Sequence, residues 1–163
     1  MKFIEPVIIP PIKGKPNVEV RIMKVKEIMS TKIASLDSND SIEKAAQLMK
    51  QYDVGSIPVC NRDKVIGIVT DRDIALRATA DGGDAKQTVR DIMSSDPVVG
   101  SPDMDVHDAA RIMSEKQIRR LPIVDHNSLI GIVALGDISL EPTLQDNAQE
   151  TLKNISQPGH GSM

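Results

Sequence analysis

A hydroxyl and a carboxylate stand three residues apart where a predicted strand runs into a predicted helix. Thr70 follows the apolar run Val65–Val69, and Asp73 precedes the helical run Ile74–Leu76. This spacing suits a capping box, in which both side chains bind backbone amides of the first helical turn. It also suits a ribose, because an ionised carboxylate can accept hydrogen bonds from two vicinal hydroxyls. The two interpretations are compatible. Gly67, inside the strand, indicates the close approach of another backbone or of a ligand.

Three arginines are candidates for contacting phosphate, because the planar guanidinium donates paired hydrogen bonds. Arg72 lies inside the Thr-x-x-Asp motif, while Arg119 and Arg120 precede the apolar run Leu121-Pro122-Ile123. A solvated surface charge is the alternative for any single arginine. The pair is more informative, because it replaces Gly55-Ser56 at the same place in an internal repeat.

The residue groupings typical of a metal site or a catalytic centre are absent from the sequence. The three histidines, His107, His126 and His160, are scattered, and the single cysteine, Cys60, lies in an apolar run typical of a core. Metal sites need several ligands at helical or hairpin spacing. The glycine-rich phosphate loop that ends in Gly-Lys-Ser/Thr is absent as well. We therefore predict no metal ion, no catalytic cofactor and no enzymatic activity.

The elements that position these residues occur twice, because residues 25–76 match residues 89–140 without a gap. Each copy contains a short extended segment, an amphipathic helix, a strand hairpin and a second helix. One such unit is short for an independent core. The predicted fold class is therefore α+β, with two β-α-β-β-α repeats packed with pseudo-twofold symmetry. The second copy has Ala134-x-x-Asp137 where the first has Thr70-x-x-Asp73.

The chain divides into five parts on this pattern. We expect an N-terminal extended arm (1–24), a first repeat (25–80), a linker (81–88), a second repeat (89–141), and a C-terminal helix with a flexible tail (142–163). The helical positions Ala45, Met49, Ala109 and Met113 form an apolar stripe that we expect to be partly exposed. Such a patch marks an interface, so we predict a homodimer through these helices.

Composition limits the classes of partner. The 163 residues are 40% hydrophobic and carry a net charge of −3, with both signs interspersed. This argues against general binding to nucleic acid or to anionic membranes, which would require a basic face. The sequence has no apolar stretch long enough to span a bilayer and no signal-peptide pattern at its start. We therefore expect a cytoplasmic protein.

Residues 25–140 resemble a tandem pair of CBS domains, the cystathionine-β-synthase-type repeat, which together form a Bateman module. The resemblance rests on motifs that occur in both copies: Ile-Met-Ser at each start, Ala-Ala-x-x-Met in the helix, Ile/Leu-Pro-Val/Ile, and Gly-Ile-Val followed by the Thr/Ala-x-x-Asp motif. It implies the β-α-β-β-α unit, adenosine-nucleotide binding in clefts between the repeats, and frequent assembly into disc-like homodimers.

The resemblance also implies roles for individual residues. Thr70 and Asp73 match the ribose-binding motif of the family; Asp137 matches the same aspartate, but Ala134 lacks the hydroxyl. The segment bordering adenine is matched by Ile33 and Ala34, and the apolar wall of the base pocket by Val54, Ile57 and Pro58. Basic residues that contact phosphate in the family correspond to Arg72, Arg119 and Arg120.

The sequence therefore predicts a regulatory module without catalytic activity. It would bind an adenosine-containing nucleotide of the AMP, ADP or ATP class, signal through dimer geometry, and act on an unknown effector protein. Two alternatives remain open. One is a structural dimerisation module with a vestigial pocket, and the other is a sensor of S-adenosylmethionine or of a cyclic dinucleotide.

Overall fold

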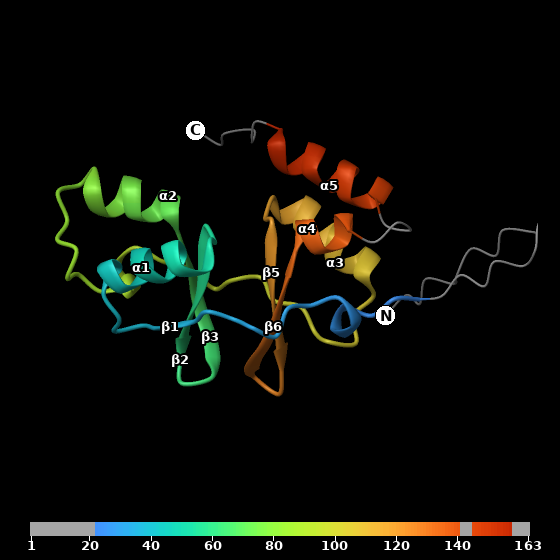
Figure 1. Cartoon of the computed structure of the whole chain (residues 1–163), viewed down its shortest axis with the longest axis horizontal. Coiled ribbons are helices and arrows are strands. Elements are labelled where there is room, and N and C mark those ends of the chain that lie inside the picture. The colour runs from blue at the N-terminus through green and yellow to red at the C-terminus, as the bar shows by residue number, and fades with distance from the viewer. Residues whose placement is uncertain (1–21, 141–144, 158–163) are drawn as a thin grey trace, which may run out of the picture.

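The first repeat folds as a short strand, a helix, a strand hairpin and a second helix, in the order predicted (Figure 1). The computed structural model describes residues 22–140 and 145–157. After the 3-10 turn η1 (Val25–Glu27), the elements are β1 (Leu36–Asp37), α1 (Ile42–Tyr52), β2 (Ser56–Asn61), β3 (Lys64–Thr70), α2 (Asp71–Asp73) and its π-helical continuation η2 (Ile74–Thr79).

The second repeat has its helix, hairpin and second helix at the equivalent positions, which confirms the α+β class and the duplication. Its elements are η3 (Val89–Asp91), β4 (Ser94–Ser95), α3 (Val106–Lys116), β5 (Arg120–Asp125), β6 (Ser128–Ala134) and α4 (Leu135–Ser139). Its counterpart of β1 is a parallel bridge between Gly100 and Ile123, and β4 lies nearer the start of the repeat. A further helix, α5 (Gln145–Ser156), follows the repeat and packs against α3 and α4 (Figure 1). Most of the predicted arm, and the predicted end of the tail, lie outside the described residues.

Local signals in the sequence set the ends of the long helices. The Ser41 hydroxyl accepts a hydrogen bond from the Lys44 amide at 3.1 Å, which caps the start of α1. The carboxylate of Asp105 caps α3 by accepting from the His107 amide at 2.8 Å. Both helices then end at a residue in the left-handed conformation, and for α3 that residue is Gln117, with φ of 53°.

The opening segment of each repeat pairs with the sheet of the other repeat. Strand β4, which opens the second repeat, runs antiparallel to β3, with Ser94 opposite Ile68. In the reciprocal pairing, the Ser30 amide donates to the Ile132 carbonyl at 2.8 Å, and the Ile132 amide donates to the Ser30 carbonyl at 3.0 Å. The two exchanged segments give the repeats the pseudo-twofold relationship that the sequence predicts.

The turns before these segments are exchanged as well. Val25 of η1 is buried in the core of the second repeat, and Val89 of η3 is buried in the core of the first. Hydrogen bonds from Lys26 (2.9 Å) and Lys24 (3.3 Å) to Asp103 fasten η1 and lower the pKa of the Asp103 carboxyl. The folded units thus differ from the sequence repeats, because each unit contains the other repeat's opening segment.

Two glycines make the exchanged pairings possible. A Cβ at residue 67 would collide with the Met93 sulfur and come within 2.9 Å of the Ser94 carbonyl oxygen. Met29 lies against Gly131 in the same way. The close approach predicted at Gly67 is therefore confirmed, and the approaching group is the backbone and side chain of an exchanged segment.

The prediction of an exposed helical stripe for dimerisation is wrong. Ala45, Ala109 and Met113 are 0% exposed, and Met49 is 7% exposed. Their spacing of three and four residues places them on the helix face that packs against the strands of the same unit. The stripe is the core face of each helix, so it offers no surface to a second chain.

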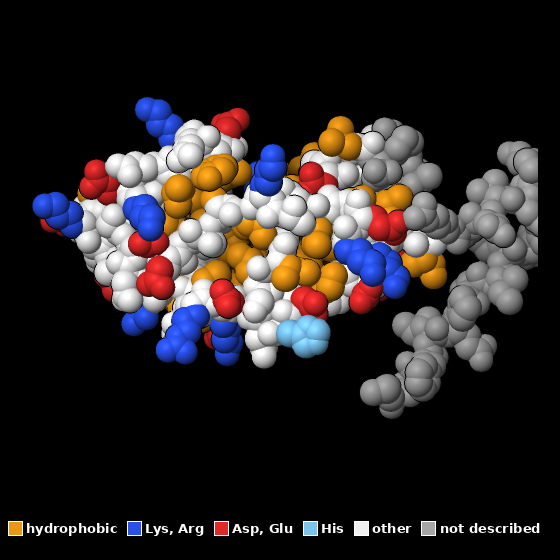
Figure 2. Space-filling view, turned by 60° about the horizontal axis from the view of Figure 1, so that its bottom comes forward, with side chains coloured by type: hydrophobic (Ala, Val, Ile, Leu, Met, Phe, Trp, Pro, Cys, Tyr) orange, Lys and Arg blue, Asp and Glu red, His pale blue; other side chains and the backbone are white. Residues whose placement is uncertain are grey.

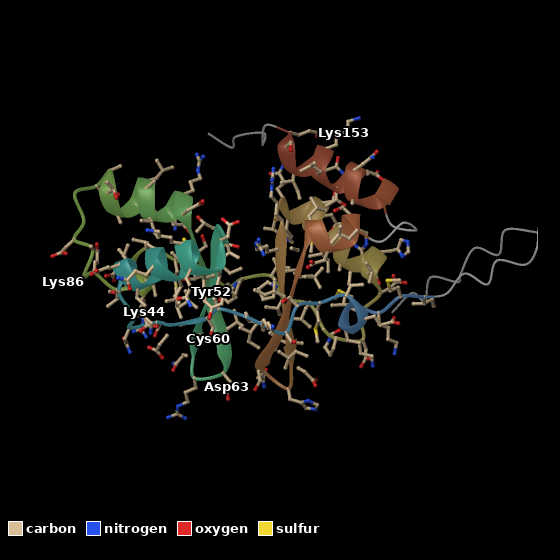
Figure 3. The ribbon with its side chains drawn as sticks, in the orientation of Figure 1. Lys44, Tyr52, Cys60, Asp63, Lys86 and Lys153 are labelled. Atoms are coloured by element: carbon tan, nitrogen blue, oxygen red, sulfur yellow. The ribbon has the colours of Figure 1, made fainter. Side chains whose placement is uncertain are left out.

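The surface of the described chain carries charges of both signs. Figure 2 shows Lys, Arg, Asp and Glu side chains spread over one face, with hydrophobic side chains along its middle. Cys60 lies in β2 (Figure 3) and is 6% exposed, as its apolar setting predicts; burial raises the pKa of its thiol. Within residues 22–140 and 145–157, no helix has the length and apolar character needed to cross a membrane.

Substitution of the two glycines tests the exchange. We expect Gly67→Ala and Gly131→Ala each to lower the free energy of unfolding by about 1–3 kcal/mol, because the added methyl overpacks the contact with methionine. Gly67→Ala should cost more, since it also meets a backbone oxygen. Chemical denaturation measures both. Gly136→Ala is the matched control, because a Cβ there has nothing within 4 Å; an equal loss in that variant would contradict the explanation.

Candidate functional site

A cleft of about 1120 Å³ lies between the two repeats, where β3 and β6 end and α2 and α4 begin. Known ligand sites occupy about 300–1,000 Å³, so this cleft has room for a drug-sized or nucleotide-sized molecule. One wall comes from β2, β3 and α2, and the facing wall comes from β5, β6 and α4. Helix α5 supplies a further wall.

The two facing walls use the same positions of the two repeats. Five positions recur with a spacing of 64 residues, which is the spacing of the duplication itself. The pairs are Gly55 and Arg119, Ser56 and Arg120, Thr70 and Ala134, Asp71 and Leu135, and Arg72 and Gly136. The cleft therefore straddles the pseudo-twofold axis, and at every one of these pairs the two residues differ in chemistry.

The charged side chains that line the cleft are three arginines and one aspartate. Arg72 comes from the first repeat together with Asp71, and Arg119 and Arg120 come from the second. Within the described part of the chain, no ion pair or side-chain hydrogen bond engages the three guanidiniums. An excess of positive charge without internal partners favours an anionic ligand, and arginine is the residue best suited to phosphate.

Equivalent hydrogen bonds fix the two ends of the cleft. The Asp71 amide donates to the Gly55 carbonyl at 3.0 Å, and the Leu135 amide donates to the Arg119 carbonyl at 2.8 Å. In each repeat the start of the second helix is thereby hydrogen-bonded to the residue immediately before the hairpin. A Cβ at Gly55 would lie 3.2 Å from the Asp71 carboxylate, so the glycine keeps this end open.

Thr70 and Asp73 form the capping box that their spacing predicts. The Asp73 amide donates to the Thr70 hydroxyl at 3.0 Å, and the Thr70 amide donates to the Asp73 carboxylate at 2.9 Å. The second carboxylate oxygen of Asp73 lies 3.7 Å from the guanidinium of Arg77. Thr70 lines the cleft, whereas the Asp73 side chain is only 13% exposed and lies behind it. The capping interpretation is confirmed. A ligand could bind only the second oxygen of the Asp73 carboxylate, and that oxygen would then interact with both the ligand and Arg77.

The second copy of the motif keeps half of the box. The Ala134 amide donates to the Asp137 carboxylate at 2.7 Å, but residue 134 has no hydroxyl to accept the returning bond. Ala134 lines the cleft, and Asp137 is half-buried beneath it. Asp137 therefore has a capping role that matches that of Asp73.

The residues that the family resemblance assigns to the base pocket do not line this cleft, although Val54 and Ile57 adjoin Gly55 and Ser56, which do. Ile33, Ala34 and Val54 are half-buried, and the latter two pack on the core of the first repeat. Ile57 is 0% exposed and Pro58 is also buried in β2. Of the predicted site residues, the cleft thus brings together Thr70, Arg72, Arg119 and Arg120.

Several residues of the cleft were missed by the sequence analysis. Asp71 could have been found from the repeat alignment, because it lies inside the Thr70-x-x-Asp73 motif at the position equivalent to Leu135. Gln117 is equivalent to Asp53, and nothing in that difference indicates a place in the cleft. A C-terminal helix is predicted within residues 142–163, but nothing in the sequence indicated that this helix would line the cleft.

Comparison with known proteins agrees with the fold and the duplication. The CBS domain family matches residues 25–78 and again residues 89–141. The CBS domain-containing protein YhcV of Bacillus subtilis is 48% identical over 132 residues, which span 81% of this chain and 94% of that protein.

Two similar solved structures bear on ligands and assembly. The CBS domain pair of protein MJ0100, in complex with 5′-methylthioadenosine and S-adenosyl-L-methionine, has a TM-score of 0.66 and 33% identity, covering 74% of this chain and 95% of that one. A hexameric CBS-CP12 protein from bloom-forming cyanobacteria has a TM-score of 0.68 and 29% identity, covering 78% and 76%. With two matched repeats, the exchanged segments and a relative of nearly equal extent, this chain belongs to the CBS domain family as a tandem pair.

Proposed function

We propose that this chain is a regulatory module that binds an adenosine-containing nucleotide in the cleft between its repeats. The observation that carries the proposal is the set of three guanidiniums, without partners in the described residues, that converge on the cleft beside hydroxyl side chains. The ligands of the similar MJ0100 pair both contain adenosine, which supports this class.

The asymmetry of the cleft gives the ligand a direction. Arg119 and Arg120 would bind phosphate from the second repeat, and Arg72 would close on it from the first. The hydroxyls of Ser56 and Thr70 lie on the first-repeat wall, where they can bind sugar or phosphate oxygens. A ligand that touches both walls stabilises one packing of the repeats over another, and such a difference in affinity is what a regulatory signal requires.

The assignments carried over from the family stay part of the proposal. Asp73 would bind the ribose hydroxyls, and the equivalent Asp137 would do so at a second site. The base would lie toward Ile33, Ala34 and Val54, in front of Ile57 and Pro58. Because Ile57 has no exposed surface, the residues that cover it would have to shift before a base could touch it.

Calorimetric titration with AMP, ADP, ATP, S-adenosylmethionine and a cyclic diadenosine nucleotide tests the proposal directly. Binding of at least one of them at micromolar concentration is expected. If none binds at millimolar concentration, the cleft is vestigial and the chain is a structural module instead.

Self-association is a separate part of the proposal. We infer a homodimer, formed by surfaces other than the buried core faces of α1 and α3, that passes the signal to a partner protein. The hexameric CBS-CP12 relative indicates that larger assemblies also occur in this family. Light scattering should give twice the 17.7 kDa of one chain; a monomer, or six times that mass, would contradict a dimer.

Replacement of the arginine pair tests phosphate binding. We expect the double variant Arg119→Ala, Arg120→Ala to weaken ATP far more than adenosine, because a hydrogen bond to a charged group contributes about 1.5–3 kcal/mol. Calorimetry with both ligands provides the comparison. Arg111→Ala is the matched control, since that exposed arginine pairs with Asp108 and Glu115 on the outside of α3. Equal losses of affinity for ATP and adenosine would show that the two arginines are solvated surface charges that do not bind phosphate.

The two aspartates provide a matched test of ribose binding. Asp73→Asn and Asp137→Asn both weaken a helix cap, so each should lower the free energy of unfolding by a few tenths to about 1 kcal/mol. If Asp73 also binds the ribose, Asp73→Asn should reduce affinity by roughly tenfold, for about 1.4 kcal/mol, and Asp137→Asn should reduce it less because Ala134 supplies no neighbouring hydroxyl. Thermal melts and calorimetry with ribo- and deoxyribonucleotides separate the two effects. A variant Asp73→Asn that melts lower but binds normally would reject the ribose role.

A further inference from the structure

Helix α5 lies outside the two CBS repeats yet forms part of the cleft. The family match ends at residue 141, and α5 begins at Gln145. Ala148, Leu152 and Ile155 line the cleft, and their spacing of four and three residues places them on one face of the helix. Leu152 is 42% exposed even though α5 is packed on α3 and α4. An exposed leucine on the wall of a cleft is available to the apolar part of a ligand.

A second set of α5 residues attaches the helix to the second repeat. The Thr151 hydroxyl donates to the Ala110 carbonyl at 3.3 Å, and Thr151 is only 3% exposed. The Asn154 amide group donates to the Ser114 hydroxyl at 2.6 Å. The helix is therefore docked by polar contacts to α3 while its apolar face borders the cleft.

Gln117 connects the end of α5 to the segment that carries the arginine pair. Its side-chain amide donates to the backbone carbonyls of Asn154 (3.2 Å) and Gln157 (3.5 Å), which lie at the C-terminal end of α5. Gln117 also lines the cleft and lies two residues before Arg119. A ligand that binds Arg119 and Arg120 would thus act on the same short segment that fastens the helix.

We propose that α5 is a wall of the ligand site and that its docking is coupled to occupancy. Phosphate on Arg119 and Arg120 and an apolar contact with Leu152 together favour the docked helix. By reciprocity, whatever displaces α5 lowers the affinity of the cleft by the same factor. This coupling rests on the proposed nucleotide site and extends it to an element outside the repeats, through which occupancy is communicated.

Hydrogen exchange and calorimetry on the full chain test the coupling, with ATP and S-adenosylmethionine as probes. A bound probe should slow amide exchange in residues 145–156 at least fivefold, because exchange reports local opening. Leu152→Ala should weaken the probe by roughly tenfold through lost apolar contact. Gln117→Ala should lose most of the slowing in α5 and, by reciprocity, should weaken the probe by a similar factor.

Two controls separate the ligand contact from general effects. Lys153 is the residue next to Leu152, but its own side chain projects away from the body of the protein (Figure 3), so Lys153→Ala is one control. Leu140→Ala makes the same substitution at a leucine that is 79% exposed and does not line the cleft. Both should bind within twofold of the unaltered chain. Thermal melts check that Leu152→Ala is folded, which its partial exposure predicts.

The outcomes distinguish the coupling from the site itself. If the unaltered chain binds a probe while exchange in α5 is unchanged and Leu152→Ala binds equally well, the coupling is wrong and the site stands. If Leu152→Ala weakens binding but Gln117→Ala leaves the slowing in α5 intact, the route through Gln117 is wrong. If neither probe binds the unaltered chain, the proposed function fails and the coupling fails with it.

Discussion

The close approach of two backbone segments at Gly67 and Gly131 determines how the repeats are joined. Each glycine lies against a methionine from the opening segment of the other repeat, Met93 in one case and Met29 in the other. Any larger residue would push these segments away. The exchanged pairing brings the ends of β3 and β6 to the same place, and the cleft is formed there. The position of the candidate site therefore depends on two glycines, Gly67 and Gly131, that do not themselves line it.

Duplication explains where the cleft lies, and divergence explains its chemistry. A symmetric scaffold places equivalent positions opposite one another, so identical repeats would present identical charges across the cleft. Here small and hydroxyl residues of the first repeat face Arg119 and Arg120 of the second, and Asp71 occupies the position of Leu135. The two walls thus differ in charge, so a ligand with one anionic end would have a single favoured orientation in the cleft. The hydroxyl of Thr70, which Ala134 lacks, adds to the same asymmetry.

Much of the fold followed from local pattern, while the assembly of the elements did not. The hydrophobic periodicity predicted the helices and hairpins, and the Thr70–Asp73 spacing predicted a capping box, because both depend on neighbouring residues. The exchange could not be inferred, since the apolar patterns of the two repeats are alike and either opening segment could pack on either sheet. Ala45 and Met113 were predicted to be partly exposed because their spacing defines a helix face without showing what covers it; they face a core. The arginines of the cleft were identified because they break the repeat. Helix α5 has no equivalent in the first copy, and Gln117 is equivalent to Asp53, a difference that gave no indication of a contact with α5.

The exchange of opening segments also constrains how this chain reaches its folded state. Ser30 and Ile132 pair across 102 positions of sequence, and contacts of such separation form late because the chain entropy lost in closing the loop must be offset first. During synthesis the first repeat has no β4 to cover Gly67 until residues of the second repeat emerge. The second repeat, by contrast, is synthesised after the segment around Ser30 that pairs with its strand β6. A cut between the two halves would therefore leave each hairpin without the opening segment that pairs with it.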